Sequence, residues 1–265
     1  MPQKHDPNTA QTASASYRLA ALDHDFLLSR EMRGVRFLLE YSKADLALQR
    51  RNIRSTVVVF GSARIREDGP GKQAHWYAEA RKFGHICSER GGALRAEGEP
   101  KHNVIATGGG PGAMEAANRG AREAGALTIG FNIRLPEEQE PNPYTTPDLT
   151  FQFHYFAMRK MHLAMRANAL VIFPGGFGTM DELFEILTLR QTKKARLIPI
   201  VLFDEAYWRS AISFDTFVQN GMINAEDLDL FRFAESADAA WAALVEQGIG
   251  AAHPPEDEED LARDM

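Results

Sequence analysis

The sequence predicts an α/β fold of the Rossmann-like, doubly wound type, in which a mainly parallel sheet carries helices on both faces and a helical extension precedes it. Short β-branched runs alternate with stretches of helical periodicity along most of the chain. Two of these runs, residues 102–107 and 169–173, lead directly into glycine-rich turns that open helices. Hydrophobic residues make up 44% of the 265, which is enough to build a sizeable core.

Composition and periodicity divide the chain into four segments. Residues 1–14 are rich in Gln, Thr, Ser, Asn and Pro, which predicts a disordered tail. Residues 15–53 carry apolar side chains at helical spacing and predict two helices with a break near Ser29. This extension packs either on the core or on a neighbouring subunit. Residues 54–250 predict a Rossmann-like α/β domain, and residues 251–265 predict an acidic disordered tail.

The predicted core alternates strands and helices, as a parallel sheet requires. A proline-rich loop at residues 132–147 follows the third strand and is a candidate lid or selectivity loop. Strands are expected at residues 55–60, 102–107, 127–131, 149–153, 169–173, 197–203 and 230–233, and helices at residues 73–90, 113–124, 156–168, 183–190, 208–220 and 237–247.

Charge, cysteine content and hydropathy exclude several classes of protein. The net charge of −6 argues against non-specific binding to nucleic acid. Cys87 is the single cysteine, so neither an internal disulfide nor a cysteine-based zinc site is expected, and a cytoplasmic location fits. No apolar run approaches the roughly 20 residues that span a bilayer, and the polar N-terminus lacks the apolar stretch of a secretory signal. The histidines show no paired spacing, so no metal is expected.

The stretch P-G-G-F-G-T-M-D-E, residues 174–182, is the centre of the predicted site. The order of strand, turn and helix presents backbone N–H groups and a helix N-terminus at one edge of the sheet. Three glycines let the backbone approach a ligand closely, and the partial positive charge of the helix start favours an anion, most simply a phosphate. We expect Thr179 to cap the helix and to donate its hydroxyl to the same anion. Plain helix capping is the alternative, but it leaves the three glycines unexplained.

A second glycine-rich turn follows the second predicted strand. Its glycines are contiguous and do not form the G-x-G-x-x-G dinucleotide pattern. The carboxyl ends of parallel strands lie at one edge of a sheet, so both turns are expected to face one crevice, together with Gly61 and Ser62 after the first strand.

Arg159 and Lys160 lie near the start of a predicted helix, where the helix dipole disfavours cations. A charge placed against its electrostatic preference indicates a functional role. A solvated basic patch is the alternative. Met158 precedes the pair and is a candidate for core packing or for the nucleoside side of the crevice.

Together these features resemble the LOG family of cytokinin riboside 5′-monophosphate phosphoribohydrolases, also described as lysine decarboxylase-like. The family pattern P-G-G-x-G-T-x-x-E is complete at residues 174–182, and Arg159 stands 23 residues before its glutamate. The resemblance covers residues 55–246. Residues 108–115 read G-G-G-P-G-A-M-E, where plant-type members resemble G-G-G-x-x-G-L-M-G. That form is similar to bacterial relatives that act as nucleotide 5′-monophosphate nucleosidases, and the long N-terminal segment also departs from the plant type.

The resemblance implies hydrolysis of the N-glycosidic bond of a nucleoside 5′-monophosphate, such as AMP or an N6-substituted cytokinin ribotide, to free base and ribose 5-phosphate, without a cofactor. It also implies homodimers or larger homo-oligomers, and neither nucleic acid nor membrane is an expected partner. It implies catalytic roles for Arg159 and Glu182, phosphate binding by Gly175, Gly176, Gly178, Thr179 and Lys160, and nucleoside binding by Gly61, Ser62, Gly109, Gly110, Gly112, Glu115 and Met158.

Three alternatives stay open on sequence. The preferred base is undetermined, and with it the choice between cytokinin activation and nucleotide salvage. A non-catalytic nucleotide sensor or carrier shares this fold, although such a binder has no need of both Arg159 and Glu182. A decarboxylase would need pyridoxal phosphate on a lysine, and no lysine in the sequence is singled out for that role.

Overall fold

The computed structural model describes residues 7–135, 140–193 and 198–249 and divides the chain into two compact units, residues 1–43 and 44–265. The predicted acidic tail lies outside the described residues. So do the middle of the proline-rich loop, residues 136–139, and the start of the predicted sixth strand at residue 197. Among the described residues, no helix combines the length and the apolar character needed to cross a membrane.

The first unit is helical and contains no buried residue within its described part, residues 7–43. The predicted break near Ser29 is confirmed, because α2 ends at Leu28 and Arg36 Nη1 donates to the Ser29 carbonyl at 2.6 Å. Apolar side chains of this unit face solvent: Leu19, Leu22 and Leu28 are each 72% exposed. Its elements are α1 (Thr9–Thr12), η1 (Ala15–Tyr17), η2 (Ala20–Leu22), α2 (His24–Leu28) and the start of α3 (Arg33–Arg50).

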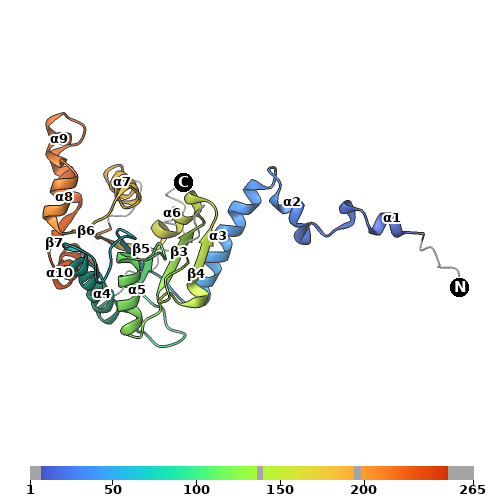
Figure 1. Ribbon diagram of the computed structural model, residues 1–265, viewed down its shortest axis with the longest axis horizontal. Helices are drawn as coiled ribbons and strands as arrows, with labels where there is room; N and C mark the ends of the chain where they lie inside the picture. The colour runs from blue at the N-terminus through green and yellow to red at the C-terminus, as the bar shows by residue number, and fades with distance from the viewer. Residues whose placement is uncertain (1–6, 136–139, 194–197, 250–265) are drawn as a thin grey trace. The chain divides into compact units, whose positions relative to one another are not determined.

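The second unit is built on a seven-stranded, all-parallel sheet in the order β4-β3-β2-β1-β5-β6-β7, which confirms the predicted fold class (Figure 1). The chain runs outward from β1 to β4 and then returns to β5 on the other side of β1. The direction of the chain therefore reverses between β1 and β5, and open parallel sheets bind ligands at the carboxyl ends of the strands where such a reversal occurs. The strands are β1 (Thr56–Phe60), β2 (Val104–Thr107), β3 (Ile129–Ile133), β4 (Thr150–Phe153), β5 (Ala167–Ile172), β6 (Ile200–Phe203) and β7 (Arg232–Ala234).

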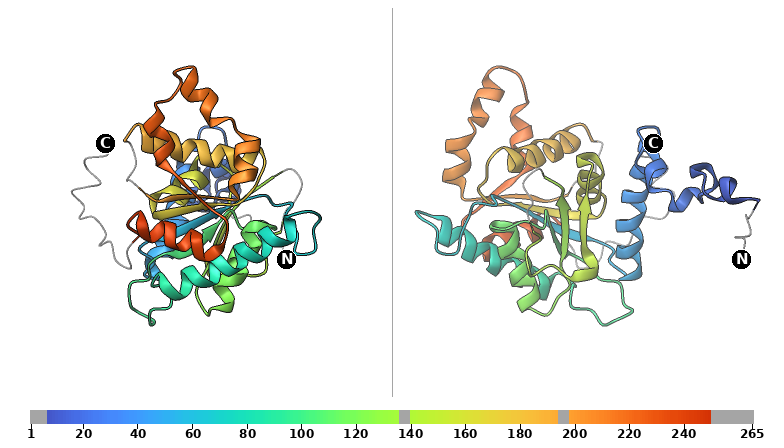
Figure 2. Two further views of the ribbon diagram at one scale, coloured as in Figure 1. Left: turned by 90° about the vertical axis from the view of Figure 1, so that its left-hand side faces the viewer. Right: turned by 45° about the vertical axis from the view of Figure 1, so that its right-hand side comes forward.

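Helices cover both faces of this sheet (Figures 1 and 2). Because side chains alternate along a strand, Val57 and Val59 of β1 pack under α4, α5 and α10, whereas Val58 and Phe60 face the core on the side of α6 and α7. The helices of this unit are α4 (Gln73–Arg90), α5 (Ala113–Glu123), α6 (Phe156–Met165), α7 (Phe177–Gln191), α8 (Glu205–Ala211), α9 (Phe214–Gln219) and α10 (Ala237–Glu246), with the 3-10 turns η3 (Pro147–Leu149) and η4 (Ala225–Leu230).

Three predicted helices have different limits in the structure. The helix expected at residues 183–190 begins six residues earlier, since α7 is Phe177–Gln191. The single helix expected at residues 208–220 is two helices, because the extended backbone of Ile212 breaks it and lets both Trp208 and Phe214 reach the core. The helix expected to reach residue 168 ends at Met165, since Ala167 already pairs with Thr56 of β1.

Candidate active site

Three loops meet at the carboxyl edge of the sheet, as predicted for the ends of parallel strands. The Ser62 N–H donates to the Pro174 carbonyl at 3.0 Å, and the Ser62 carbonyl accepts from the Ala113 N–H at 3.2 Å. A Cβ built on Gly61 would lie 2.6 Å from the Ala113 Cβ, so a side chain has no room there. Gly61 and Ser62 therefore join the two glycine-rich turns into one rim.

The turn before α7 differs from the prediction in its capping. The N-cap is Gly176, and Thr179 is the third residue of the helix, so the expected capping role of Thr179 is wrong. Thr179 is 7% exposed and packs against the loop, since a Cβ built on Gly175 would lie 2.1 Å from the Thr179 Oγ1. The close approach of Thr179 therefore requires glycine at position 175.

Gly176 and Gly178 are exposed, and a Cβ built on either would meet no heavy atom of the described residues within 4 Å. Neither has a positive φ. The folded chain therefore imposes no steric need for glycine at these two positions. A ligand that approaches the backbone closely would impose one.

Arg159 and Glu182 come together beside this turn, on α6 and α7. Arg159 Nη2 lies 3.7 Å from Glu182 Oε1, and the two side chains are 13% and 7% exposed. Arg159 Nε donates to the Phe131 carbonyl in β3, at 3.0 Å. A Cβ built on Gly108 would lie 2.9 Å from Arg159 Nη2, so the guanidinium also borders the first glycine-rich turn.

Burial controls the protonation of this pair. It raises the pKa of the Glu182 carboxyl, and the positive charges of Arg159 and Lys160 only partly oppose the effect. Burial lowers the pKa of the Arg159 guanidinium, which nevertheless stays protonated at neutral pH. The site therefore holds a fixed cation beside a carboxylate whose proton affinity is above normal.

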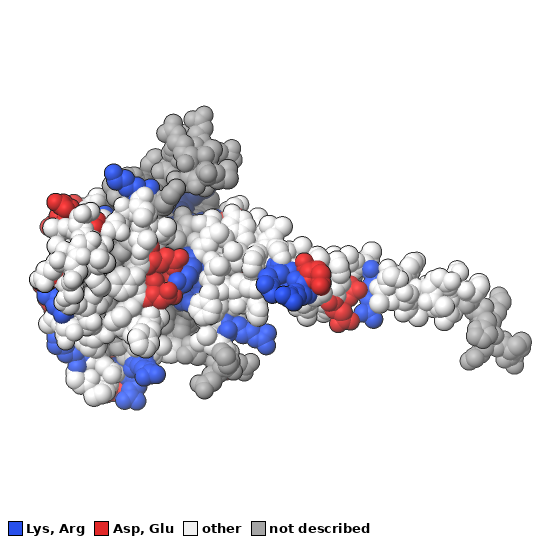
Figure 3. Space-filling model, turned by 90° about the horizontal axis from the view of Figure 1, so that it is seen from above, with Lys and Arg blue, Asp and Glu red and all other residues white. Residues whose placement is uncertain are grey.

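Lys160 is paired with two acids of α7. Its Nζ lies 2.7 Å from Asp181 Oδ2 and 2.8 Å from Glu185 Oε2. Basic and acidic side chains also lie next to each other on the face drawn in Figure 3. The ammonium of Lys160 therefore joins α6 to α7 in this structure, and its predicted contact with phosphate stays a prediction.

A buried polar network holds the first glycine-rich turn. The Thr107 hydroxyl accepts from the Gly109 N–H at 2.9 Å and donates to Asn118 Oδ1 at 2.7 Å. Asn142 Nδ2 lies 3.0 Å from the same Asn118 oxygen and 3.1 Å from the Gly110 carbonyl. Sequence reasoning missed Asn118 and Asn142, because their partners lie 11 to 32 residues away.

Two predicted nucleoside contacts have protein partners. Glu115, in the first turn of α5, accepts a hydrogen bond from the Tyr77 hydroxyl at 2.9 Å. Met158 is partly buried and packs against the core on the side of α6. Gly112 has φ +76°, and a Cβ there would lie 2.2 Å from the Ser62 carbonyl oxygen. Their predicted contacts with a nucleoside stay predictions.

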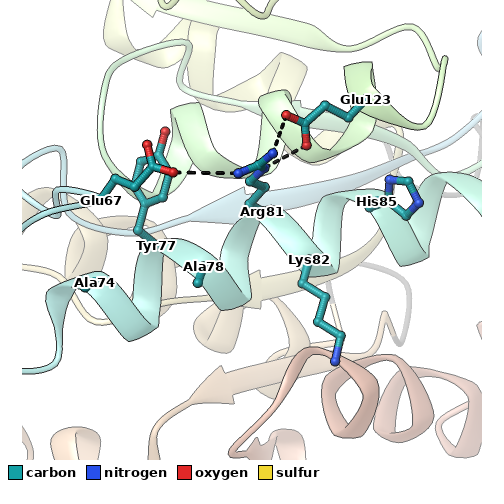
Figure 4. Close-up of a pocket in the computed structure, with 8 residues that line it drawn as sticks. All are labelled: Glu67, Ala74, Tyr77, Ala78, Arg81, Lys82, His85 and Glu123. Atoms are coloured by element: carbon teal, nitrogen blue, oxygen red, sulfur yellow. Dashed lines mark hydrogen bonds and ion pairs between the residues drawn. The ribbon is translucent and has the colours of Figure 1, made fainter.

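An open hollow of about 400 Å³ lies along α4 (Figure 4). Arg81 points between two acids, with its guanidinium 2.7 Å from Glu123 and 3.6 Å from Glu67. Lys82 pairs with Asp238 at 2.7 Å. Acids already pair with both of these cations, so the hollow suits a phosphate less well than the exposed residues at the start of α7 do.

Comparison with known proteins points to one family. The family model described as possible lysine decarboxylase matches residues 114–244. A probable cytokinin riboside 5′-monophosphate phosphoribohydrolase of Oryza sativa subsp. japonica, LOG4, is 27% identical over 151 residues, which cover 56% of this chain and 64% of the relative. The cytokinin riboside 5′-monophosphate phosphoribohydrolase of Mycobacterium marinum is 32% identical over 98 residues, which cover 37% of this chain and 50% of the relative. The chain thus spans less than two thirds of the length of these relatives.

Two solved structures share the fold. The X-ray structure of TM1055 matches with a TM-score of 0.51 and 22% identity, over 73% of this chain and 99% of that one. The molybdenum cofactor binding protein of Rippkaea orientalis matches with a TM-score of 0.50 and 19% identity, over 74% of this chain and 99% of that one. At these identities the likeness concerns the arrangement of the sheet and helices alone.

Proposed function

The chain belongs to the LOG, or lysine decarboxylase-like, family, and from that premise we propose that it hydrolyses the N-glycosidic bond of a nucleoside 5′-monophosphate. The products are the free base and ribose 5-phosphate. AMP and N6-substituted AMP are the proposed substrates. The observation that carries the proposal is the pair of the partly buried Arg159 and the buried Glu182, 3.7 Å apart, beside an exposed glycine-rich helix start.

The start of α7 suits the 5′-phosphate. Gly176, Phe177 and Gly178 are exposed at the N-terminus of a 15-residue helix, where backbone N–H groups lack intrahelical acceptors. The helix dipole adds a favourable field for an anion. We assign the phosphate to the N–H groups of Gly175, Gly176 and Gly178, with the buried Thr179 hydroxyl as a further donor.

Glu182 and Arg159 suit the chemistry at the sugar. Breaking the bond to the base builds positive charge on the anomeric carbon and its ring oxygen, which a nearby carboxylate stabilises. The oxygen of a water molecule forms the new bond to that carbon, and the bond to the base nitrogen breaks with its electron pair leaving on the base. Glu182 accepts the proton of the water, a role that its raised pKa favours.

Arg159 holds the charges of this reaction in place. Its Nε is tied to the Phe131 carbonyl, so the Nη groups point between the first glycine-rich turn and Glu182. A guanidinium fixed in this way orients the ribose phosphate and keeps Glu182 ionised near neutral pH. The proposed lining for the nucleoside consists of Gly61, Ser62, Gly109, Gly110, Gly112, Glu115 and Met158.

The test is base release from a panel of nucleotides. The purified full chain is incubated with AMP, N6-isopentenyl-AMP, GMP, CMP and UMP, and free base is separated by chromatography. The proposal expects release from at least the adenine nucleotides. A preference for the N6-substituted nucleotide would favour cytokinin activation, and a broad profile would favour salvage. Nucleotide binding without release from any member would contradict the proposal and favour the sensor or carrier.

A further inference from the structure

We propose that Tyr207 is a positioning residue for the phosphate-binding turn, an inference that rests on the proposed function. Tyr207 lies on α8, 32 residues beyond the turn, and its hydroxyl donates to the Gly175 carbonyl at 2.8 Å. Neither glycine-rich motif predicts this contact. It reaches the backbone that we assign to the phosphate, on the buried side of the loop.

The contact with Tyr207 also fixes the direction of the Gly176 N–H, because of the geometry of the peptide bond. The carbonyl of Gly175 and the N–H of Gly176 belong to one planar trans peptide, so they point in opposite directions. A hydroxyl that holds the carbonyl toward the protein therefore aims the Gly176 N–H outward. Gly176 is exposed, and a Cβ built on it would meet no heavy atom of the described part of the chain within 4 Å, so we expect an anion to have access to that N–H.

The turn needs such a restraint because glycine backbones are permissive. Gly175 and Gly176 flank the peptide in question, and Gly176 lacks a side chain that would restrict its rotation. An N–H group that must be reoriented on binding contributes less to the binding free energy than one that is already fixed in place. Tyr207 supplies the fixed orientation.

Tyr207 is itself anchored at its other end. Asp204 is 2% exposed, takes φ +69°, a conformation unfavourable for a residue with a side chain, and caps α8 by accepting from the Tyr207 N–H at 3.0 Å. Its second oxygen accepts from Lys72 Nζ at 2.8 Å and from Trp76 Nε1 at 2.9 Å. The Trp76 and Tyr207 rings meet edge to face, with centroids 5.6 Å apart. The phenol ring is thus fixed by α4 and α8 together.

The test is Tyr207→Phe, which removes the hydroxyl and keeps the ring. We expect binding of AMP, ribose 5-phosphate and inorganic phosphate to weaken about three- to tenfold, the range of one hydrogen bond, at an unchanged melting temperature. Adenosine, which lacks the phosphate, is expected to bind as it does to the wild type. In turnover, KM for AMP rises by the same factor and kcat changes less than twofold.

Two further variants serve as controls for Tyr207→Phe. Tyr77→Phe removes a hydroxyl that is bonded to Glu115 on α5, and it is expected to leave the affinity for inorganic phosphate unchanged. Trp76→Phe removes one donor to Asp204 but keeps Tyr207, and it is expected to weaken phosphate binding less than Tyr207→Phe.

Several outcomes would overturn the inference. Equal affinity of wild type and Tyr207→Phe for inorganic phosphate is one, and equal weakening of adenosine and AMP is another. An effect of Tyr77→Phe as large as that of Tyr207→Phe would be a third. Binding is measured by calorimetry and needs no turnover, so a protein that binds AMP without cleaving it would contradict the proposed function and still test Tyr207.

Discussion

Arg159 Nη2 lies 3.7 Å from Glu182 Oε1, although the two residues belong to helices that follow different strands. The topology explains how they meet. α6 carries the chain from the edge strand β4 back to β5, which lies next to the central strand β1, and α7 begins where β5 ends. Both helices therefore start at the carboxyl edge of the sheet, and Arg159 and Glu182 lie near those starts. The reversal of the chain between β4 and β5 therefore brings Arg159 and Glu182 together.

Replacing Arg159 by lysine tests whether the guanidinium is needed. A lysine ammonium is one compact group and cannot both bond the Phe131 carbonyl and face Glu182, as the guanidinium does. We therefore expect kcat/KM for AMP to fall about 100-fold. The matched control is Arg209→Lys, in an exposed pair with Glu205, which is expected to retain full activity. Equal activity of Arg159→Lys and wild type would contradict the assigned role.

The pH dependence of kcat/KM tests the protonation state of Glu182. Burial raises the pKa of the Glu182 carboxyl, and Glu182 must be ionised to act as a base. Activity is therefore expected to be lost as the pH falls through a value above the ordinary glutamate pKa of about 4.3. Removing the opposing cation with Arg159→Gln is expected to move this acid limb to higher pH. An acid limb that stays in place in Arg159→Gln would show that Glu182 does not control it.

Replacing Lys160 distinguishes two roles for its ammonium, an ion-paired link between α6 and α7 or a contact with phosphate. Its ammonium is already paired with Asp181 and Glu185, so Lys160→Met is expected to raise the Michaelis constant for AMP less than threefold and to lower the free energy of unfolding by less than about 1 kcal/mol. The measurements are steady-state kinetics and urea unfolding. If the Michaelis constant instead rose about 30-fold or more, roughly 2 kcal/mol, the phosphate contact predicted from sequence would be restored.

The buried network under the first turn makes a prediction about stability. Asn142→Ala leaves the Gly110 carbonyl without its side-chain donor and is expected to lower the free energy of unfolding by about 1–3 kcal/mol. It also frees the turn, so turnover of AMP is expected to fall at temperatures where the variant is still folded. Asn220→Ala, at an exposed helix end, is the control for urea unfolding. A variant with wild-type stability would show that the network is not important for the fold.

The features that could be predicted from sequence were those that depend on residues adjacent along the chain. The buried run before residue 174, the glycines and the following helical period are adjacent along the chain, and the structure has this order of strand, turn and helix. The position of the cap was missed, because Thr179 packs back on Gly175 and the helix already begins at Phe177. Local preference favoured threonine as a cap, and tertiary packing decided otherwise.

Contacts between distant segments had no signal of this kind. Tyr207 bonds Gly175 across 32 residues, and Asn142 bonds Asn118 across 24. Nothing in the periodicity of α8 or of the loop before Asn142 distinguishes these side chains from ordinary surface or turn residues. The break between α8 and α9 was missed for a related reason, since burying both Trp208 and Phe214 requires a change of direction that the apolar spacing alone does not show.

The measurement that tests the central claim most directly is the fate of AMP with wild type and Glu182→Gln in parallel. Adenine and ribose 5-phosphate are quantified, and AMP binding is measured by calorimetry on the same samples. We predict that the wild type releases the two products in equal amounts, whereas Glu182→Gln still binds AMP and releases them at least about 100 times more slowly. Equal rates in the two proteins, or AMP binding by the wild type without any adenine release, would contradict the account.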